Sequence, residues 1–512
     1  MAPNRAAAHN ARVARQDSKH EWISRGAGLR WLGALTLGWM ALCVAAYWGT
    51  KSVGDARARA ALQRLRDSGA AVLPEDLAAA PQRQGTPATV WIARFEALEQ
   101  DKARAARVGF QGFDGMGLST SVFAPGPGRV YYGDDSELDV ALREAPETKE
   151  LSELCAGQVL RFFWAIDHAL DDPAVASERR DALLFTLRWI GAHDQAALDF
   201  ARTACAAAPA GIEELLELPR EGMPWLPHYP FDALDGVTVQ LAALARLQAL
   251  NGDGSECART LEALFCASAL TADLPWQVAY EHGAQLQVRA LHTLGQCVAY
   301  LPDGVDMSRI VAALDGLDPQ GRYVRALEGE CAFANQMFLD HAHDDVAFVA
   351  DGESPGLFAQ WLANATRGFD HAAYLEITEH AVAIARAAPR EARTLGAAYT
   401  AAQPPWTVFA TWFAPHIGAE YPSWVAVEAR LRLCKLALIA RSAGFADAQQ
   451  ACATLLDPFT NAAMHSRIDA DGALTLWSVG SDGLDSAAPR IGSGITMGTT
   501  SIDDLAIVLP AR

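Results

Sequence analysis

The feature that most constrains this chain is an uncharged stretch of 20 residues near its N-terminus, WLGALTLGWMALCVAAYWGT, from Trp31 to Thr50. A helix of this length rises about 30 Å, which is the thickness of the hydrocarbon core of a bilayer. Trp31 and Trp48 would then place one indole at each membrane interface. The stretch therefore predicts a single transmembrane helix over residues 31–50, with the lipid bilayer as its partner.

Basic residues flank the predicted span. The first 66 residues hold 11 Lys/Arg and 3 Asp/Glu, although the whole chain has a net charge of −19. Six of the basic residues precede the span, which favours a cytoplasmic N-terminus. Five follow it, but long downstream domains are translocated largely regardless of charge. We therefore expect a single-pass protein of the inner (cytoplasmic) membrane, with its body in the periplasm or outside the cell.

A cleaved signal peptide is the competing interpretation of the same segment. Val44, Ala45 and Ala46 would form a small-residue cleavage site after a short apolar region. The basic lead of 30 residues and the continuation of the apolar stretch through Trp48 favour an uncleaved anchor. A second apolar run, residues 431–440, is too short to span a membrane and contains two charges.

The rest of the chain is acidic and has the composition of a folded protein. After residue 66 the net charge is −27, which repels phosphate backbones and argues against nucleic acid as a partner. Hydrophobic residues make up 51% of the sequence, and 512 residues exceed one ordinary core. Two or three structural units are therefore expected.

Helical periodicity dominates the body. The clearest case is residues 234–270, where Leu234, Val237, Leu241 and Leu244 fall on one helical face and Asn251-Gly252 ends it. A second apolar stripe follows within a few residues, so the two helices must pack antiparallel. Similar units are expected at 275–299, 306–316, 321–339, 356–386 and 423–443.

The expected fold class is mainly α. It combines an N-terminal transmembrane helix, an irregular array of antiparallel helical hairpins and a small α+β module at the C-terminus. The expected regions are a basic cytoplasmic tail (1–30), the transmembrane helix (31–50), a juxtamembrane helix with a Gly/Pro-rich connection (51–135), the helical-hairpin body (136–422) and the C-terminal module (423–512).

Nine cysteines are present, and eight of them lie outside the span. An even number outside the cytoplasm permits disulfides. Most of these cysteines occupy apolar positions of helical patterns, where a free thiol serves as a small hydrophobe. The sequence leaves both states open, and the absence of a C-x-x-C pair excludes zinc ribbons.

The most tempting catalytic cluster is Asp340-His341-Ala342-His343-Asp344-Asp345. Its histidines and aspartates would suit a metal, and the string resembles the H-x-H-x-D-H motif of metallo-β-lactamase-like hydrolases. Val346 stands where that motif has its last His, and a helical segment precedes the cluster where that family has a strand. A polar helix end is therefore favoured, and a metal-dependent hydrolase using His341 and His343 is the alternative.

Other polar residues of the body suit structural roles. Glu328 and Glu330 would pair as acid and base, but an inter-helix or solvated polar face is favoured. His282 and His380 are single histidines in helical patterns, for which a hydrogen-bonded structural role is expected. The sequence has no nucleophile elbow, phosphate-binding loop or H-E-x-x-H motif.

The tail changes character after a strong helix that begins at Ser423 and ends at Gly444. A short helix over about 446–455 follows. Residues 463–468 and 473–479 then flank the turn Asp469-Ala470-Asp471-Gly472, which predicts a β-hairpin. A last apolar run, residues 505–509, would add a third strand.

Three strings in this tail carry a resemblance: DPFTN from Asp457, WSVGSDG from Trp477 and DDLAIV from Asp503. On these strings, about the last 90 residues resemble the globular C-terminal region of the type II secretion major pseudopilin. The resemblance implies a calcium ion in the acidic loop after the hairpin. Asp482 and Asp503 or Asp504 occupy the matching positions, and the spacing of this chain adds Asp485.

The differences from that family are large. A prepilin cleavage motif is missing, and the pilin-like helix lies about 370 residues beyond the anchor. We therefore do not expect the chain to polymerise as a pilin subunit. The whole chain also resembles a group of uncharacterised bacterial membrane-anchored helical proteins, on ARARAALQRLRDSG and LPEDL after the span.

The sequence favours a non-enzymatic, membrane-anchored extracytoplasmic protein with an interaction or structural role in the cell envelope. Its protein partners are not identified by the sequence. The two alternatives are the metal-dependent hydrolase and a secretion-system-associated, pseudopilin-like protein stabilised by calcium.

Overall fold

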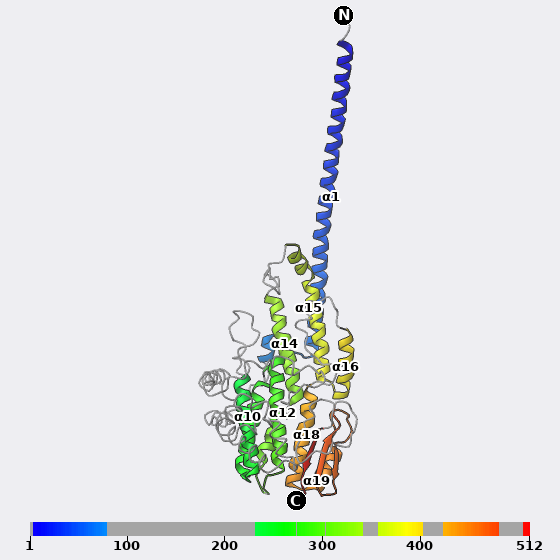
Figure 1. Cartoon of the computed structure of the whole chain (residues 1–512). Coiled ribbons are helices and arrows are strands. Elements are labelled where there is room, and N and C mark those ends of the chain that lie inside the picture. The colour runs from blue at the N-terminus through cyan, green and yellow to red at the C-terminus, as the bar shows by residue number, and fades with distance from the viewer. Residues whose placement is uncertain are drawn as a thin grey trace, which may run out of the picture.

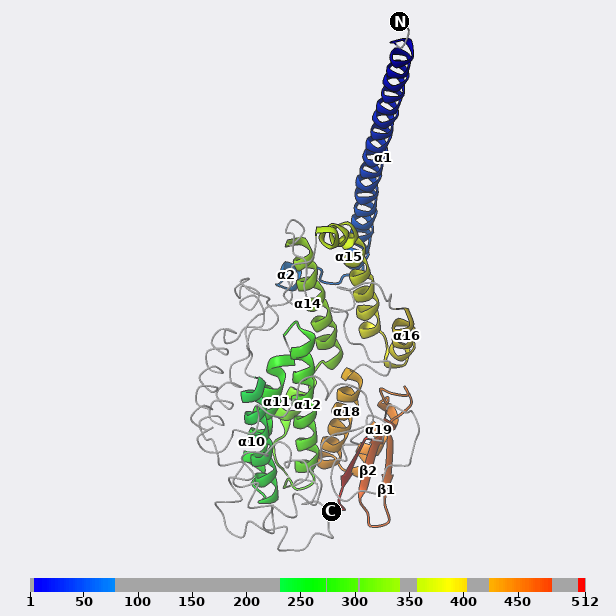
Figure 2. The ribbon, with the colours of Figure 1, turned by 45° about the horizontal axis from the view of Figure 1, so that its top comes forward.

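The computed structural model describes residues 4–78, 231–272, 274–302, 304–340, 357–402, 423–480 and 505–511. These residues are mainly helical, with one small sheet (Figures 1 and 2). The helices are α1 (Asn4–Asp67), α2 (Pro74–Ala78), α10 (Phe231–Leu250), α11 (Gly254–Ala272), α12 (Gln277–Val298), α13 (Ser308–Asp315), α14 (Pro319–Asp340), α15 (Leu357–Arg386), α16 (Pro389–Ala402), α18 (Ser423–Ser442) and α19 (Phe445–Thr454). The strands are β1 (His465–Ile468), β2 (Leu474–Ser478) and β3 (Leu505–Leu509).

Helix α1 is a single helix of 64 residues, about 96 Å long at about 1.5 Å per residue. Most of it projects from the body (Figure 1). The helix over residues 31–50 is confirmed, as is its continuation beyond Lys51. The segment Arg30–Asp67 is long and apolar enough to cross a membrane by length and composition, a test that a signal sequence near an N-terminus also passes. Helix α1 ends at Asp67, and Gly69 follows with a φ of +75°.

Within the described residues, helices lie at the segments where the sequence predicted them, from 234–270 to 423–443, and residues 136–230 of the expected helical-hairpin body lie outside the described ranges. Helices α10 and α11 are joined by a short turn in which Gly252 has a φ of +78°, a value that glycine adopts without steric cost. Helices α10, α11 and α12 pack side by side (Figure 2). Helices α14 and α15 pack against each other, and α15 also packs along α1. Helix α16 was not anticipated from the sequence, although Pro389 at its first position is a favourable helix start.

The C-terminal segment folds as its pattern predicted. Strands β1, β2 and β3 form an antiparallel sheet in that order, with Ile468 opposite Leu474 across the turn and Ser478 opposite Leu505. Gly472 closes the turn with a φ of +82°. The sheet and helix α19 lie at the end of the body that is farthest from the N-terminus (Figure 1).

One cluster of buried apolar side chains extends from Ala61 in α1 to Leu509 in β3. Helix α18 joins the sheet to this cluster because it packs on α12, where the Cys434 thiol lies 3.2 Å from the Leu291 carbonyl oxygen. None of the seven cysteines within the described residues is part of a disulfide bond. Burial raises the pKa of both Cys331 and Cys434 to about 12, so these thiols remain protonated and act as small apolar side chains.

Candidate functional site

The most distinctive arrangement in the structure is the junction between α1 and the body. The buried residues on this part of α1 follow one another at spacings of four and three. A helix has 3.6 residues per turn, so such residues form one continuous stripe. A matching stripe runs along α15. The two sets are Gly54, Ala58, Ala61 and Leu65 on α1, and Ala365, Gly368, Ala372 and Leu375 on α15.

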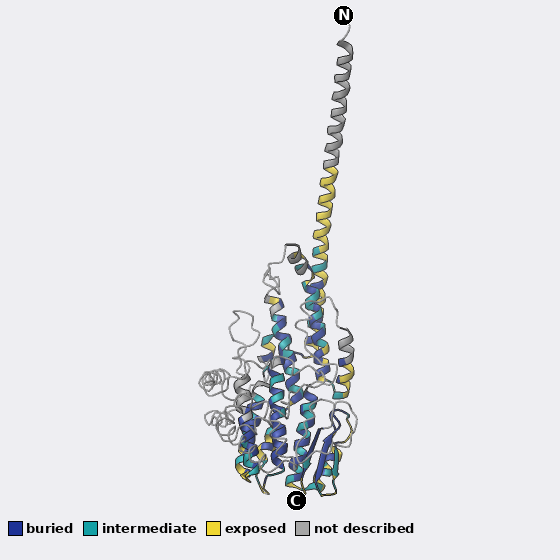
Figure 3. Ribbon diagram, in the orientation of Figure 1, coloured by how far each residue is buried: buried dark blue, intermediate teal, exposed yellow. Residues whose placement is uncertain are grey.

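The two helices run parallel. At one end, the rings of Tyr47 and Trp361 lie 5.5 Å apart. At the other, Arg64 Nε lies 3.0 Å from an oxygen of Glu379. Contacts thus advance in the same direction along both chains. In Figure 3 the exposed stretch of α1 ends where α15 begins beside it, so the body starts at the end of the apolar stretch without a flexible linker.

Two glycines allow the helices to approach each other closely. A Cβ atom built on Gly368 would stand 2.5 Å from the backbone nitrogen of Asp55 and 2.5 Å from the carbonyl carbon of Gly54. A Cβ atom on Gly54 would stand 2.9 Å from the backbone nitrogen of Phe369. Because backbone atoms cannot rotate out of the way, only glycine fits both positions without separating the helices.

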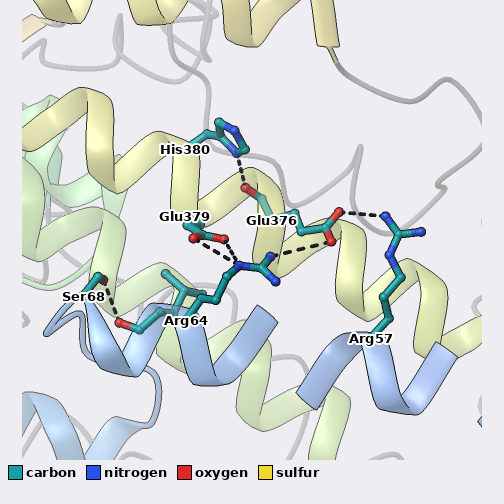
Figure 4. Close-up of polar contacts among 7 residues, drawn as sticks. Arg57, Arg64, Ser68, Glu376, Glu379 and His380 are labelled. Carbon is teal, nitrogen blue, oxygen red and sulfur yellow. Dashed lines mark hydrogen bonds and ion pairs between the residues drawn. The ribbon is translucent and has the colours of Figure 1, made fainter. Parts of the chain in front are cut away.

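Ion pairs line the exposed edge of this contact (Figure 4). Glu376 lies between two guanidinium groups, 3.3 Å from Arg57 and 3.7 Å from Arg64. Both arginine side chains are about half exposed, and such pairs contribute only about 0–1 kcal/mol each. Their main effect is to favour one register of α1 on α15. His380, also exposed, places Nδ1 2.6 Å from the Glu376 carbonyl oxygen, which agrees with a structural role.

Arg386 closes the lower end of the junction. Its guanidinium group donates to the carbonyl oxygens of Ser68 and Gly69, just beyond the end of α1, and to the carboxylate of Glu328 on α14. Burial raises the pKa of Glu328, and the hydrogen bond from Arg386 partly opposes this rise. One cation therefore joins the C-terminus of α1 to both α14 and α15, as expected for a charge at a helix C-terminus.

A buried polar network extends the junction inward. Asn335 on α14 donates from Nδ2 to the carbonyl oxygen of Val72 at 2.7 Å. Its Oδ1 atom lies 2.8 Å from Nε2 of His371 on α15. Because the amide oxygen can only accept, His371 carries its hydrogen on Nε2. Phe338 stacks on this imidazole at 4.4 Å, and burial lowers the pKa of His371 to about 4. His371 is therefore neutral at ordinary pH.

Glu330 links this region to α12. The backbone N–H of Gln277 donates to its carboxylate at 3.2 Å. Trp276, at the N-cap of α12, makes no capping hydrogen bond with its side chain, so Glu330 supplies that acceptor from a different helix. Burial raises the pKa of Glu330 to about 7, and the nearby Glu281 adds to the rise. Glu328 and Glu330 thus contact different partners at helix junctions, as the favoured inter-helix interpretation expected.

The predicted metal ligands lie outside the described residues. This applies to Asp482, Asp485, Asp503 and Asp504 and also to His341 and His343. Helix α14 runs to Asp340, so the residues before His341 are helical, as the sequence indicated. Within the described ranges, no group of three or more His, Cys, Asp or Glu side chains is placed to hold a metal ion.

Asp457 has a structural role in the C-terminal segment that the sequence pattern did not indicate. Its carboxylate is fully buried and accepts hydrogen bonds from the backbone N–H groups of Phe459, at 2.8 Å, and Val479, at 2.9 Å. Asn461, four residues later, has a φ of +60° and donates its N–H to the Asp457 carbonyl oxygen. The only sequence signal was the position of Asp457 at the head of the DPFTN string.

The chain matches no protein-family model, no curated protein and no solved structure.

Proposed function

We propose that this chain is a membrane-anchored, extracytoplasmic protein whose helical body is held against the membrane by α1. Its role in the cell envelope would be structural or would involve binding other proteins, without catalysis. The anchor would be retained in the inner membrane with residues 1–30 in the cytoplasm.

The observation that carries this proposal is the division of α1 into two parts. Residues 31–48 expose large apolar side chains, with Trp31 72% and Trp48 61% exposed. A contiguous apolar surface of this kind is rare on soluble proteins and fits a membrane. From Gly54 onward the same helix is packed into the body. The part of α1 after Gly54 thus belongs to the core, and the exposed apolar part before it is the segment that a membrane would cover.

Membrane anchoring is tested by fractionating cells that produce the full chain with an epitope tag at each end. We expect both tags to remain in the membrane fraction after an alkaline wash that strips peripheral proteins. Protease added to spheroplasts should degrade the C-terminal tag and spare the N-terminal one. Loss of the N-terminal tag, together with a measured mass that corresponds to a chain starting at Tyr47, would show a cleaved signal peptide and contradict the proposal.

A second candidate function is the calcium-stabilised, pseudopilin-like module. Asp457 favours it. The Asp457 carboxylate accepts hydrogen bonds from Phe459, in the DPFTN string, and from Val479, in the WSVGSDG string. Two of the three strings that carry the resemblance are therefore in contact. Asp482, Asp485, Asp503 and Asp504 would supply the oxygen ligands that calcium prefers.

Thermal unfolding of the full chain, with calcium and with a chelator, tests this candidate. A ligand that binds the folded state must raise the unfolding temperature. We expect calcium to raise it and a variant with Asp503→Asn and Asp504→Asn to lose the response. An unchanged midpoint in the parent protein would remove the calcium proposal and leave the anchor proposal intact.

A further inference from the structure

The end of the body nearest the apolar stretch of α1 carries exposed apolar side chains from three helices. Trp48 and Val53 on α1 are 61% and 58% exposed, Leu339 on α14 is 45% exposed, and Trp361 on α15 is 36% exposed. We call these four residues the collar. They belong to segments far apart in the sequence, and the packing of α15 on α1 and of α14 on α15 brings them to one end of the body.

The contacts between helices fix the level of each collar residue. Tyr47 packs against Trp361, so Trp361 lies beside the end of the predicted span. Arg367, which lies next to Gly368, donates a hydrogen bond to the carbonyl oxygen of Phe338. Leu339 is therefore near the level of the Gly54–Gly368 contact, which is also the level of Val53. In Figure 1, α14 and α15 both reach the end of the body from which α1 projects.

These levels match the dimensions of a membrane interface. Each polar headgroup region is about 5–8 Å thick, because a bilayer of about 40–45 Å has a hydrocarbon core of about 30 Å. Val53 follows Trp48 by five residues, about 8 Å along the helix. With Trp48 at the hydrocarbon boundary, Val53 and Leu339 lie within the headgroup region. Lys51, whose ammonium group lies 5.9 Å from the Trp48 ring centroid, has the position of a cation that reaches toward headgroups.

We propose that the collar is a lipid-contacting surface, so that the α14–α15 end of the body rests in the headgroup layer of the membrane that α1 crosses. This inference rests on the proposed anchoring function and extends it to the body. The occupant is the bilayer and not a protein, because the collar continues the exposed apolar surface of α1 at the depth where aromatic residues favour the membrane interface.

Site-specific photo-crosslinking of the full chain tests the collar. A benzophenone amino acid replaces Leu339, Val53, Met40 or Leu456 in turn, and each variant is reconstituted in vesicles of phosphatidylethanolamine and phosphatidylglycerol. Leu456 is the matched control because it is 45% exposed, as is Leu339, but lies at the sheet end of the body. Met40 is 60% exposed within the span and reports on the anchor itself. Mass spectrometry identifies the adducts.

We expect lipid adducts at Met40, Val53 and Leu339 and none at Leu456. Adducts at Met40 without adducts at Leu339 and Val53 would overturn the collar and leave the anchor in place. Crosslinks from Leu339 to a second copy of the chain, or equal lipid labelling of Leu339 and Leu456, would also overturn it. Failure of Met40 to label would instead contradict the proposed anchoring function. Val53 provides a second probe of the same depth if the Leu339 variant does not fold.

Discussion

Substitution of Gly368 by alanine tests the close contact between α1 and α15 most directly. The new Cβ atom would stand 2.5 Å from the backbone nitrogen of Asp55 and from the carbonyl carbon of Gly54. Both atoms belong to the backbone of α1, so neither can rotate away. The substitution therefore has to push the two helices apart along the face that holds Ala58 and Ala61.

The expected cost follows from two opposing effects. Overpacking a tight contact costs about 1–3 kcal/mol, and a clash with backbone belongs in the upper part of that range. Alanine in place of glycine inside a helix recovers about 1 kcal/mol. We therefore expect Gly368→Ala to lower the free energy of unfolding by about 1–2 kcal/mol. The exposed ion pairs of Arg57 and Arg64 would weaken as well, with a small additional effect.

The assay is urea unfolding of the full chain in detergent, followed by near-ultraviolet circular dichroism. Gly49→Ala is the control, because Gly49 also lies inside a helix, α1, and a Cβ atom there would have no atom within 4 Å apart from those of its own helix backbone. Gly54→Ala should also destabilise, and the double variant should lose less than the two single losses combined, since both act on one contact. A Gly368→Ala protein as stable as Gly49→Ala would refute the close packing.

Four further predictions concern single side chains. Burial raises the pKa of Glu330 from 4.5 to about 7, so its stabilising effect is complete below pH 4.5 and is lost as the pH rises to 7. Glu330→Gln should remove this pH-dependent loss of stability, which amounts to roughly 3 kcal/mol at most, at about 1.4 kcal/mol per unit of pKa. The measurement is the urea midpoint between pH 5 and 8. His371 acts in the opposite direction, because its pKa falls from 6.5 to about 4 and its contribution is lost as the pH falls from 6.5 to 4; His371→Asn should flatten the stability profile there. Asp457→Ala should cost about 2–4 kcal/mol because it leaves two buried N–H groups unpaired, and a loss below 1 kcal/mol in thermal unfolding would contradict that role. Arg64→Gln should change the same midpoint by less than the equivalent of 1 kcal/mol, since its ion pairs are exposed.

Much of the local structure was predictable because its signals are local. Gly252 ends one helix, Gly444 separates two others, and the turn at Gly472 sets the hairpin register. Each of these glycines has a positive φ, a requirement that limits the residue types at that position. Helix α16 was missed because its buried positions include the small residues Ala392 and Gly396, which give no stripe of large apolar side chains.

The junction between α1 and α15 was not predictable by the same means. Short connections imply that neighbouring helices pack antiparallel, but they say nothing about two helices more than 300 residues apart in the chain. The spacing of Gly54, Ala58, Ala61 and Leu65 can be read in the sequence after the span. The helix on which these residues pack cannot, because small residues such as Gly368 carry no hydrophobic signal that selects one helix over another.

In the tail, too, some polar residues could be selected from the sequence and others only from the structure. The resemblance drew attention to carboxylates after the hairpin, where calcium would bind. It attached no role to Asp457, whose two acceptor oxygens satisfy backbone groups from separate parts of the chain. Such a role depends on the distance between Phe459 and Val479 in the folded state, which no local pattern contains.

Under the proposed anchoring, the direct passage of α1 from the apolar stretch into the body would limit how far the body can reach toward partners. A flexible linker of 16 residues would let a body explore a radius of roughly 20–24 Å, whereas a docked helix removes that freedom. The anchored body would then keep one face turned toward the membrane and would move only by lateral diffusion and rotation about the membrane normal. A partner would have to present its binding surface at a fixed height above the bilayer, which favours partners that are themselves embedded in or bound to the same membrane.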